Sequence, residues 1–410
     1  MLSRIRRGAR VLASIEIAPV ALAIAASVSF KTLLPYALGV AALFWLVRLL
    51  AYGRLTVRTP ADWPVVMMAL LVPVTLWTTA YLQVTLPEVC RLLTGIALYY
   101  AIVNWATSPR KLRWLVTGLA AAGLLLALSG LVMVDWLIRK EVIFSGSVYE
   151  QLPAPVPQAM HPNTMGAVLA ILCAMVSAML LFAWHEHGLA RGILSGFAVT
   201  GMVTVLFLTQ SRGGLLGLAI ALTLVIALRW HRGWLVFIPL GLAGVAAICV
   251  PGPRNLLEFA AVSGAMRSLQ GRIEVWLRAI YAIEDFPLTG VGMGTFGWVA
   301  SVLYPFSTSP VSYTHNLFLQ VGVDLGLPGV VAWLAILILI LVSAWELYRQ
   351  GRNRGNLWAA GLGAGLLGSQ TALVVHGMVD ATSWITWAMV VVWGLWGIAM
   401  AGERVLGEQI

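Results

Sequence analysis

Charged side chains are scarce in this chain. Only 10% of its 410 residues are Asp, Glu, Lys or Arg, whereas 60% are hydrophobic, and the mean hydropathy is +0.90. A soluble domain of this length cannot cover its surface with so little charge, so that class of protein is excluded. The composition is typical of a protein that crosses a membrane many times.

Cysteines and clustered acidic residues are also few. Cys90, Cys173 and Cys249 each lie within or at the end of an apolar segment, without the spacing of metal ligands. We interpret them as packing residues. No Asp-x-Asp or paired carboxylate lies in an early outer loop, and no His, Asp and Glu residues cluster at metal spacing. The sequence therefore predicts a functional site with no metal and no cofactor.

Long apolar segments make up most of the chain. A transmembrane helix needs about 20 apolar residues, and by that criterion we predict about twelve spans. The spans are expected at residues 14–30, 32–51, 63–81, 89–106, 113–137, 162–184, 191–209, 213–229, 234–250, 327–348, 356–377 and 383–401. The first is the weakest, because Glu16, Pro19 and Lys31 crowd its ends. We predict an all-α polytopic membrane protein with one transmembrane domain over residues 1–410.

The basic residues orient these spans. Every loop that would face the cytoplasm carries Arg if the N-terminus starts inside. Lys and Arg favour the cytoplasmic side, so we expect both termini in the cytoplasm and an N-terminal segment that is retained. Most of the net charge of +10 then comes from basic residues on the cytoplasmic side, which face anionic lipid headgroups. No nucleic-acid partner is needed to explain it.

Two outer loops are long enough to carry function. Residues 138–161 contain a Pro-x-Pro-x-Pro stretch at Pro153, Pro155 and Pro157, which favours extended backbone. Residues 251–314, between spans nine and ten, contain a predicted amphipathic helix at 271–285 and a Gly-rich turn at 289–297. The Gly-x-Gly-x-Gly at 290–294 follows a helix rather than a strand, so we favour a tight turn over a nucleotide site.

Arg212 and Arg272 are candidate anion-binding residues. Arg212 lies in Thr-Gln-Ser-Arg-Gly-Gly (209–214), where glycines and a helix N-terminus favour phosphate binding; the alternative is an Arg that reaches toward lipid headgroups. Arg272 has no acidic neighbour along its helix, whereas Arg278 follows Glu274 by four residues and is expected to pair with it. Arg267 resembles Arg272 but lacks a predicted helical context.

His315 is a candidate general base. A His at the mouth of a membrane helix titrates near neutral pH and can accept a proton from a hydroxyl group. The alternative is a buried His that bonds to a loop carbonyl. Asp324, nine residues further along an ideal helix, falls on the opposite face, so we predict no His–Asp dyad.

Other polar residues gather at the outer ends of the spans, where such groups tend to face cavities. Arg91 either binds substrate or pairs with Glu88, and Asp380 either binds substrate or bonds to His376. The candidate substrate-binding residues are Arg91, Arg267, Asn316, His161, Asn163, Tyr313 and Asp380.

A family resemblance starts at His315. His315 and Asn316, nine residues, Gly326, two residues and Gly329 resemble a motif of the bacterial O-antigen ligases, O-antigen polymerases and pilin oligosaccharyltransferases. Ser-Arg-Gly-Gly at 211–214 and the stretch 271–294 are similar to two further blocks of that superfamily. The resemblance covers about residues 160–330; the rest is similar in topology only.

The resemblance implies a GT-C-like glycosyltransferase of the bacterial inner membrane. It implies an inverting, metal-independent transfer of glycan from an undecaprenyl-pyrophosphate carrier, at a site facing the periplasm. Arg212, Arg272 and His315 correspond to functional residues of the family, and we predict that they are catalytic. The partners expected are the lipid-linked donor, a lipid A–core acceptor and membrane lipids.

The single large late loop and the chain length favour an O-antigen ligase over a polymerase. The predicted topology leaves no large C-terminal periplasmic domain, which is common in the oligosaccharyltransferases. A transporter of lipid-linked sugars is the alternative of another class. Transporters usually show internal repeats and broken polar helices near the midplane, and neither pattern is visible here.

Overall fold

The computed structural model describes residues 2–136, 138, 146–152, 159–184, 188–230, 232–236, 238–239, 265–304 and 312–407. In these ranges the chain is helical, and a single bridge between Val134 and Met160 is its only β pairing. Nine of the helices described are long and apolar enough to cross a membrane. They are α3 (Leu34–Tyr52), α5 (Leu82–Trp105), α6 (Pro109–Met133), α8 (Pro162–Ala183), α9 (Leu189–Thr209), α10 (Arg212–Arg229), α15 (Leu317–Asn353), α16 (Leu357–Gly377) and α18 (Ala388–Gly407).

These nine helices match nine predicted spans, but the total of about twelve is not confirmed. The predicted first span is α2 (Ile17–Ser29), which meets the amphipathic α1 (Leu2–Ser14) at a bend of 49°. The predicted third span is α4 (Asp62–Thr78), an apolar helix of 17 residues that is shorter than the nine. Most of the predicted span 234–250 lies outside the described residues.

Helices α8, α16 and α18 form the centre of the bundle. More than four-fifths of each is buried. Small residues bring their neighbours close: a Cβ on Gly363 of α16 would lie 2.5 Å from the Ala344 carbonyl oxygen of α15. Close backbone approach through small residues is the usual way that membrane helices pack. The rigid centre fixes where the ends of these helices, and the polar groups on them, lie.

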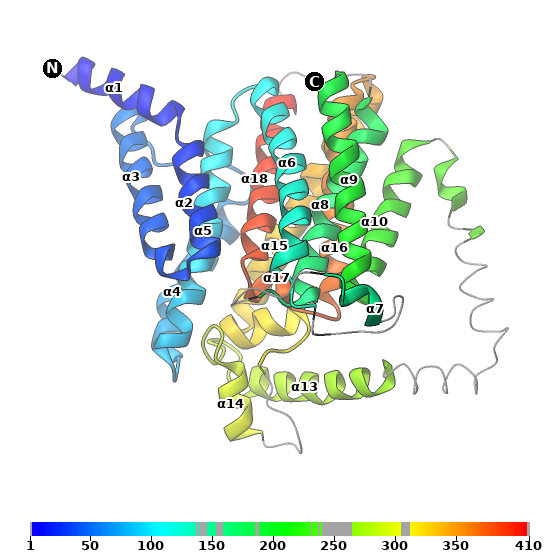
Figure 1. Ribbon diagram of the computed structural model, residues 1–410. Coiled ribbons are helices and arrows are strands. Elements are labelled where there is room, and N and C mark those ends of the chain that lie inside the picture. The colour runs from blue at the N-terminus through cyan, green and yellow to red at the C-terminus, as the bar shows by residue number, and fades with distance from the viewer. Residues whose placement is uncertain are drawn as a thin grey trace.

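Both chain ends lie at one end of the bundle, and α13 (Ala265–Asp285) and α14 (Phe296–Leu303) lie at the other (Figure 1). Helix α13 runs across the ends of the membrane helices (Figure 1). It contains the predicted amphipathic helix 271–285 and begins earlier, at Ala265. Because it lies across the bundle, α13 can direct side chains toward several helix ends at once.

Helix α15 is broken at Gly326, where the backbone takes φ 69° and ψ −175°. The predicted span 327–348 is the part after the break; a short helical segment, residues 317–325, precedes it. The turn that follows α13, residues 286–295, forms two backbone hydrogen bonds with the residues around this break. They run from Leu327 N to Pro287 O and from Val291 N to Val323 O, and both are 2.7 Å long. A Cβ on Gly326 would lie 2.8 Å from Pro287 O, so only glycine allows this contact. The Gly-rich sequence is therefore a tight turn, as predicted, and it fixes the end of α13 to α15.

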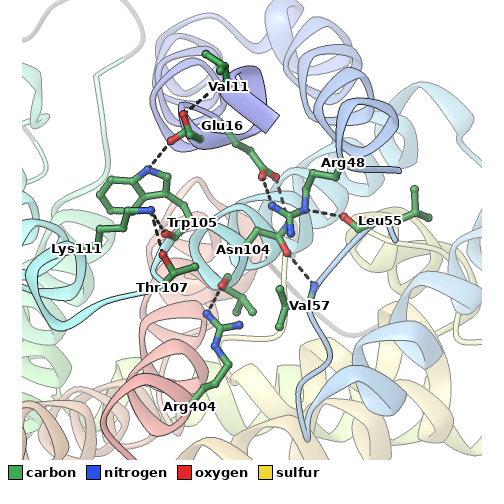
Figure 2. A network of polar contacts seen from close by, with 12 residues as sticks. Val11, Glu16, Arg48, Leu55, Val57, Asn104, Trp105, Thr107, Lys111 and Arg404 are labelled. Atoms are coloured by element: carbon green, nitrogen blue, oxygen red, sulfur yellow. Dashed lines mark hydrogen bonds and ion pairs between the residues drawn. The ribbon is translucent and has the colours of Figure 1, made fainter. Parts of the chain in front are cut away.

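A buried polar cluster at the opposite end joins the N-terminal helices to the bundle (Figure 2). Glu16, at the bend between α1 and α2, pairs with Arg48 at 3.2 Å and accepts a hydrogen bond from Asn104 at 3.2 Å. The side chains of Glu16 and Arg48 are 1% and 5% exposed. The residue that weakens the predicted first span is thus neutralised inside the protein.

Breaking this ion pair should destabilise the fold. Arg48→Met leaves the buried carboxylate of Glu16 without its cation, which costs about 3–5 kcal/mol of unfolding free energy. The double variant Glu16→Gln/Arg48→Met should recover much of that loss. Denaturation in detergent micelles measures both. The exposed pair Glu346–Arg349 provides the control, since Arg349→Met should cost at most about 1 kcal/mol.

Candidate active site

A short turn, residues 313–316, presents His315 at the start of α15. Asn316 caps the helix: its Oδ1 accepts hydrogen bonds from Phe318 N and Leu319 N, at 3.0 and 3.1 Å. Its Nδ2 donates to the Met378 carbonyl oxygen at 3.1 Å. Asn316 therefore sets the turn against the segment after α16, and its predicted role in substrate binding stays a prediction.

His315 and Gln210 are the two non-glycine residues with positive φ in the described part of the chain, at 51° and 49°. Left-handed backbone is unfavourable for such residues, and functional sites concentrate it. Gln210 ends α9 two residues before Arg212, and its amide donates to the Tyr149 hydroxyl. One strained position is thus the candidate base itself, and the other lies two residues before the candidate anion-binding Arg212. No pattern in the sequence indicated a role for Gln210 or Tyr149.

The imidazole of His315 is available to take a proton. Its Nδ1 is buried and has no hydrogen-bond partner among the described residues, and its ring lies 4.2 Å from the Tyr313 ring. Burial lowers the pKa of His315 below the ordinary value of about 6.5; the charge of Asp380 opposes this, and those of Arg272 and His161 add to it. The lowered pKa favours the neutral imidazole, the form that a general base requires.

Asp380 supplies a negative charge near that imidazole. Its carboxylate accepts hydrogen bonds from Asn163 Nδ2 at 2.9 Å and from Thr382 N at 3.0 Å. Its backbone N–H donates to the His376 carbonyl oxygen at 3.0 Å. His161 caps α8 by accepting at Nδ1 from Asn163 N, also at 3.0 Å. The ends of α8 and α16 thus hold each other beside His315.

Arg212 is the first residue of α10, and its side chain is exposed. The neighbouring glycines pack closely against other segments of the bundle. The Ser211 hydroxyl accepts from Gly214 N, and a Cβ on Gly214 would lie 2.9 Å from the Gly166 carbonyl oxygen of α8. A Cβ on Gly213 would lie 3.2 Å from the His376 ring and 3.0 Å from Val379. Gly214 N is thus already bonded within the protein, and the anion site expected at Arg212 stays a prediction that rests on the guanidinium at a helix N-terminus.

The segment 376–380 connects these parts. Gly213, next to Arg212, packs on it from one direction, and Asn316, next to His315, bonds to it from another. The charge of Arg272 on α13 reaches both His315 and Tyr313. Of the predicted site residues, the structure brings together His161, Asn163, Arg272, Tyr313, His315, Asn316 and Asp380, with Arg212 beside the same segment.

Two other arginines lie in ion pairs. Helix α5 begins at Leu82 rather than at residue 89, so Arg91 lies inside the helix, where it pairs with Glu88 and donates to Ile385 O at 2.8 Å. The helix continues through Pro87, which the apolar pattern alone did not indicate. Arg278 pairs with Glu274 at 3.5 Å, as predicted from their spacing.

Some predicted features lie outside the described residues. They are the side chain of Arg267, the three prolines Pro153, Pro155 and Pro157, and Cys249. In the part of the chain that is described, no three His, Cys, Asp or Glu side chains come close enough to hold a metal ion.

Residues 197–334 match the family model of the O-antigen ligases. This confirms the resemblance that the motifs indicate, over a stretch that contains Arg212, Arg272 and His315. No curated protein matches the chain. The match supports a glycosyltransferase-like enzyme of the ligase and polymerase superfamily, with lipid-linked glycan as substrate, in a multi-pass membrane protein.

Proposed function

We propose, from the match of residues 197–334 to the O-antigen ligase family, that this protein is an O-antigen ligase. It transfers O-antigen polysaccharide from undecaprenyl pyrophosphate to a sugar hydroxyl of lipid A–core. The observation that carries the proposal is His315, a buried imidazole with an unpartnered Nδ1 among the described residues, close to the charges of Asp380 and Arg272. The site would face the periplasm of a bacterial inner membrane, since α13 lies at the end opposite both termini.

The reaction would be a single inverting displacement. As the acceptor oxygen attacks the anomeric carbon, its proton passes to His315, and the carboxylate of Asp380 stabilises the imidazolium that forms. The bond between the anomeric carbon and the pyrophosphate oxygen breaks, and its electron pair stays on that oxygen. Arg212 and Arg272 would stabilise the charge that develops on the leaving group.

A reconstituted assay tests the function. Purified protein in nanodiscs receives radiolabelled undecaprenyl-pyrophosphate-linked glycan together with lipid A–core. A labelled lipid A–core product supports the ligase. Longer lipid-linked glycan without that product identifies a polymerase, the second member of the same superfamily. Movement of intact donor across a vesicle membrane with no covalent product identifies a transporter.

The pH dependence of transfer should report on His315. Transfer needs the neutral imidazole, so the rate should fall as the pH drops through the His315 pKa, which burial holds below its ordinary value. Asp380→Asn removes the negative charge that raises this pKa, so the acid limb of kcat/KM should move to lower pH. A limb that stays in place or moves to higher pH would mean that Asp380 does not act on His315.

Transfer should need no divalent metal. The sequence contains no cluster of metal ligands, and two arginines would take the part of a cation at the pyrophosphate. Excess EDTA should change the rate by less than about twofold, whereas catalysis by a bound metal ion would lose several kcal/mol of stabilisation. A loss that Mg²⁺ or Mn²⁺ restores would contradict this and would indicate a metal held by the pyrophosphate itself.

A further inference from the structure

A buried carboxylate lies outside the proposed chemistry. Asp324 is 1% exposed and lies two residues before the break in α15. Its Oδ1 accepts hydrogen bonds from Gly294 N and Gln320 Nε2, both at 3.1 Å, and its Oδ2 accepts one from Trp384 Nε1 at 2.8 Å. These donors belong to the turn after α13, to the short segment 317–325 and to α17 (Thr382–Ile385). Only a side chain with two acceptor oxygens can satisfy all three.

Gln320 extends this contact to the turn that carries His315. Its Oε1 accepts from Thr314 N at 2.9 Å, while the Thr314 hydroxyl donates to the Asn316 carbonyl oxygen at 2.7 Å. His315 is therefore held between two residues whose backbones are fixed. Since its left-handed conformation is unfavourable, the turn depends on these bonds to keep it.

The other bond to Oδ1 reaches the segment that ends α13. Gly294 N belongs to the turn that bonds to the break in α15. This turn begins directly after Asp285, the last residue of α13. Met293, one residue earlier, donates through its backbone N to the Thr75 hydroxyl at 2.8 Å, and that hydroxyl donates to the Asp324 carbonyl oxygen at 3.3 Å. Oδ1 of Asp324 thus accepts one bond from Gln320, which holds the turn of His315, and one from Gly294, in the turn that follows the helix of Arg272.

We infer that Asp324 is a positioning residue for transfer. Through Gln320 it holds the turn that presents His315, and through Gly294 it holds the end of the helix that carries Arg272. The carboxylate oxygens of Asp324 bond to Gly294, Gln320 and Trp384, so Asp324 acts on His315 through hydrogen bonds rather than by touching the imidazole. The inference rests on the proposed function for its effect on rate, but its effect on the turn can be measured without substrate.

The variant Asp324→Asn has a specific defect. With its amide oxygen in the place of Oδ1, it keeps Gly294 and Gln320 but turns its NH₂ group toward the Trp384 N–H. Two N–H donors then face each other where the carboxylate oxygen and Trp384 Nε1 are 2.8 Å apart, so the side chain has to move away, which weakens its bonds to Gly294 and Gln320 and, through Gln320, the link to Thr314. The other orientation is worse, because the NH₂ then faces the N–H groups of both Gly294 and Gln320. Trp384→Phe removes the indole N–H, so the first orientation is then unopposed and the link to Thr314 returns.

The experiment compares glycan transfer by D324N, W384F, D324N/W384F and W396F in nanodiscs. We expect D324N to lose about 10²-fold in kcat, the scale of a misplacement of about 1 Å in a catalytic group. W384F should stay within about tenfold of wild type, and D324N/W384F should be at least about tenfold faster than D324N, because the rescued bond restores most of that loss. W396F is the matched control: it removes a similar buried bond, from Trp396 Nε1 to Gln370 Oε1 at 2.9 Å, inside the bundle and away from His315. It should transfer at the wild-type rate.

Amide hydrogen exchange of residues 312–317 gives the readout that needs no substrate. Exchange should be faster in D324N than in wild type and should slow again in D324N/W384F, because Thr314 N–H regains its acceptor. If D324N matches wild type in both rate and exchange, or the double variant is no better than D324N, the inference is wrong. If the wild-type protein transfers no glycan at all, the proposed function fails while the exchange data still decide whether Asp324 holds the turn.

Discussion

Replacing His315 by Asn should reduce glycan transfer by about 10²–10⁴-fold, the usual contribution of a general base. Asn is a better test than Ala, because His315 has φ 51° and Asn tolerates left-handed backbone better than other residues with a side chain. The variant should therefore keep the turn and lose only the proton acceptor. Transfer by the purified variant in nanodiscs, with its melting temperature alongside, separates loss of chemistry from loss of folding.

His161→Asn is a matched control for this change. His161 caps α8 through its Nδ1, and Asn is among the best capping residues, so the helix end should survive. His161 acts on the pKa of His315 but accepts no proton in the proposed reaction. His161→Asn should therefore lose less transfer activity than His315→Asn. Near-normal transfer by His315→Asn would rule out the general base and leave His315 as a buried structural residue.

The sequence indicated which polar residues lie near helix ends, because helix ends can be inferred from hydropathy and charge. His161, Asn163, Arg212 and Asp380 lie at ends of predicted spans, and His315 directly follows the predicted loop 251–314. The bundle places these residues near one another. Helix α13 was also predictable, since its apolar residues repeat with helical spacing and Arg278 follows Glu274 by four residues. What these patterns report is the position of a residue along its own helix.

Contacts between distant segments left no such pattern. The tenth span was predicted to start at residue 327, because Gly326 and Pro328 resemble a helix boundary. In the structure α15 extends back to Leu317 through a break that the turn at 287–291 stabilises. Gly213 and Gly214 suggested an anion site, and the sequence did not show that atoms of α8, α9, α16 and Val379 lie close around them. The contacts of Asp324 come from segments that are 30 and 60 residues away in the sequence.

The prediction that Asp324 and His315 form no dyad assumed an ideal helix through both residues, whereas His315 lies in the turn before α15. In the structure the carboxylate bonds to Gly294, Gln320 and Trp384 instead. Gln320 lies four residues before Asp324, so the pair shares a helix face, a relation that the spacing does contain. The further bond from Gln320 to Thr314 depends on the turn conformation, which no local pattern indicates.

Replacing Arg212 or Arg272 should also cause large losses, if the two guanidinium groups hold the pyrophosphate between them. They approach from different elements, Arg212 from the start of α10 and Arg272 from α13, which lies across the bundle end (Figure 1). A pyrophosphate carries more than one negative charge, so a single Arg leaves it undercompensated. Each Arg→Ala change should lower transfer by about 10²–10³-fold, as the loss of one group that stabilises a developing charge does.

Lysine at either position should be a poor substitute. It keeps the charge but loses the planar pair of N–H donors that binds two phosphate oxygens at once, so Arg212→Lys and Arg272→Lys should still transfer more slowly than wild type. Arg278→Lys is the matched control on the same helix. Because Arg278 pairs with Glu274 and Lys can keep that pair, this variant should stay within about threefold of the wild-type rate, since such i,i+4 pairs contribute little energy.

The double variant tests whether the two arginines act on the same group. If both contact one pyrophosphate, Arg212→Ala/Arg272→Ala should lose less than the product of the two single losses, because residues that act as a unit are not additive. Binding of undecaprenyl pyrophosphate, measured separately from transfer, should weaken in each single variant. Losses that multiply would mean that the arginines serve independent steps. Single variants that bind and transfer like wild type would mean that Arg212 reaches toward lipid headgroups and that Arg272 acts only on the pKa of His315.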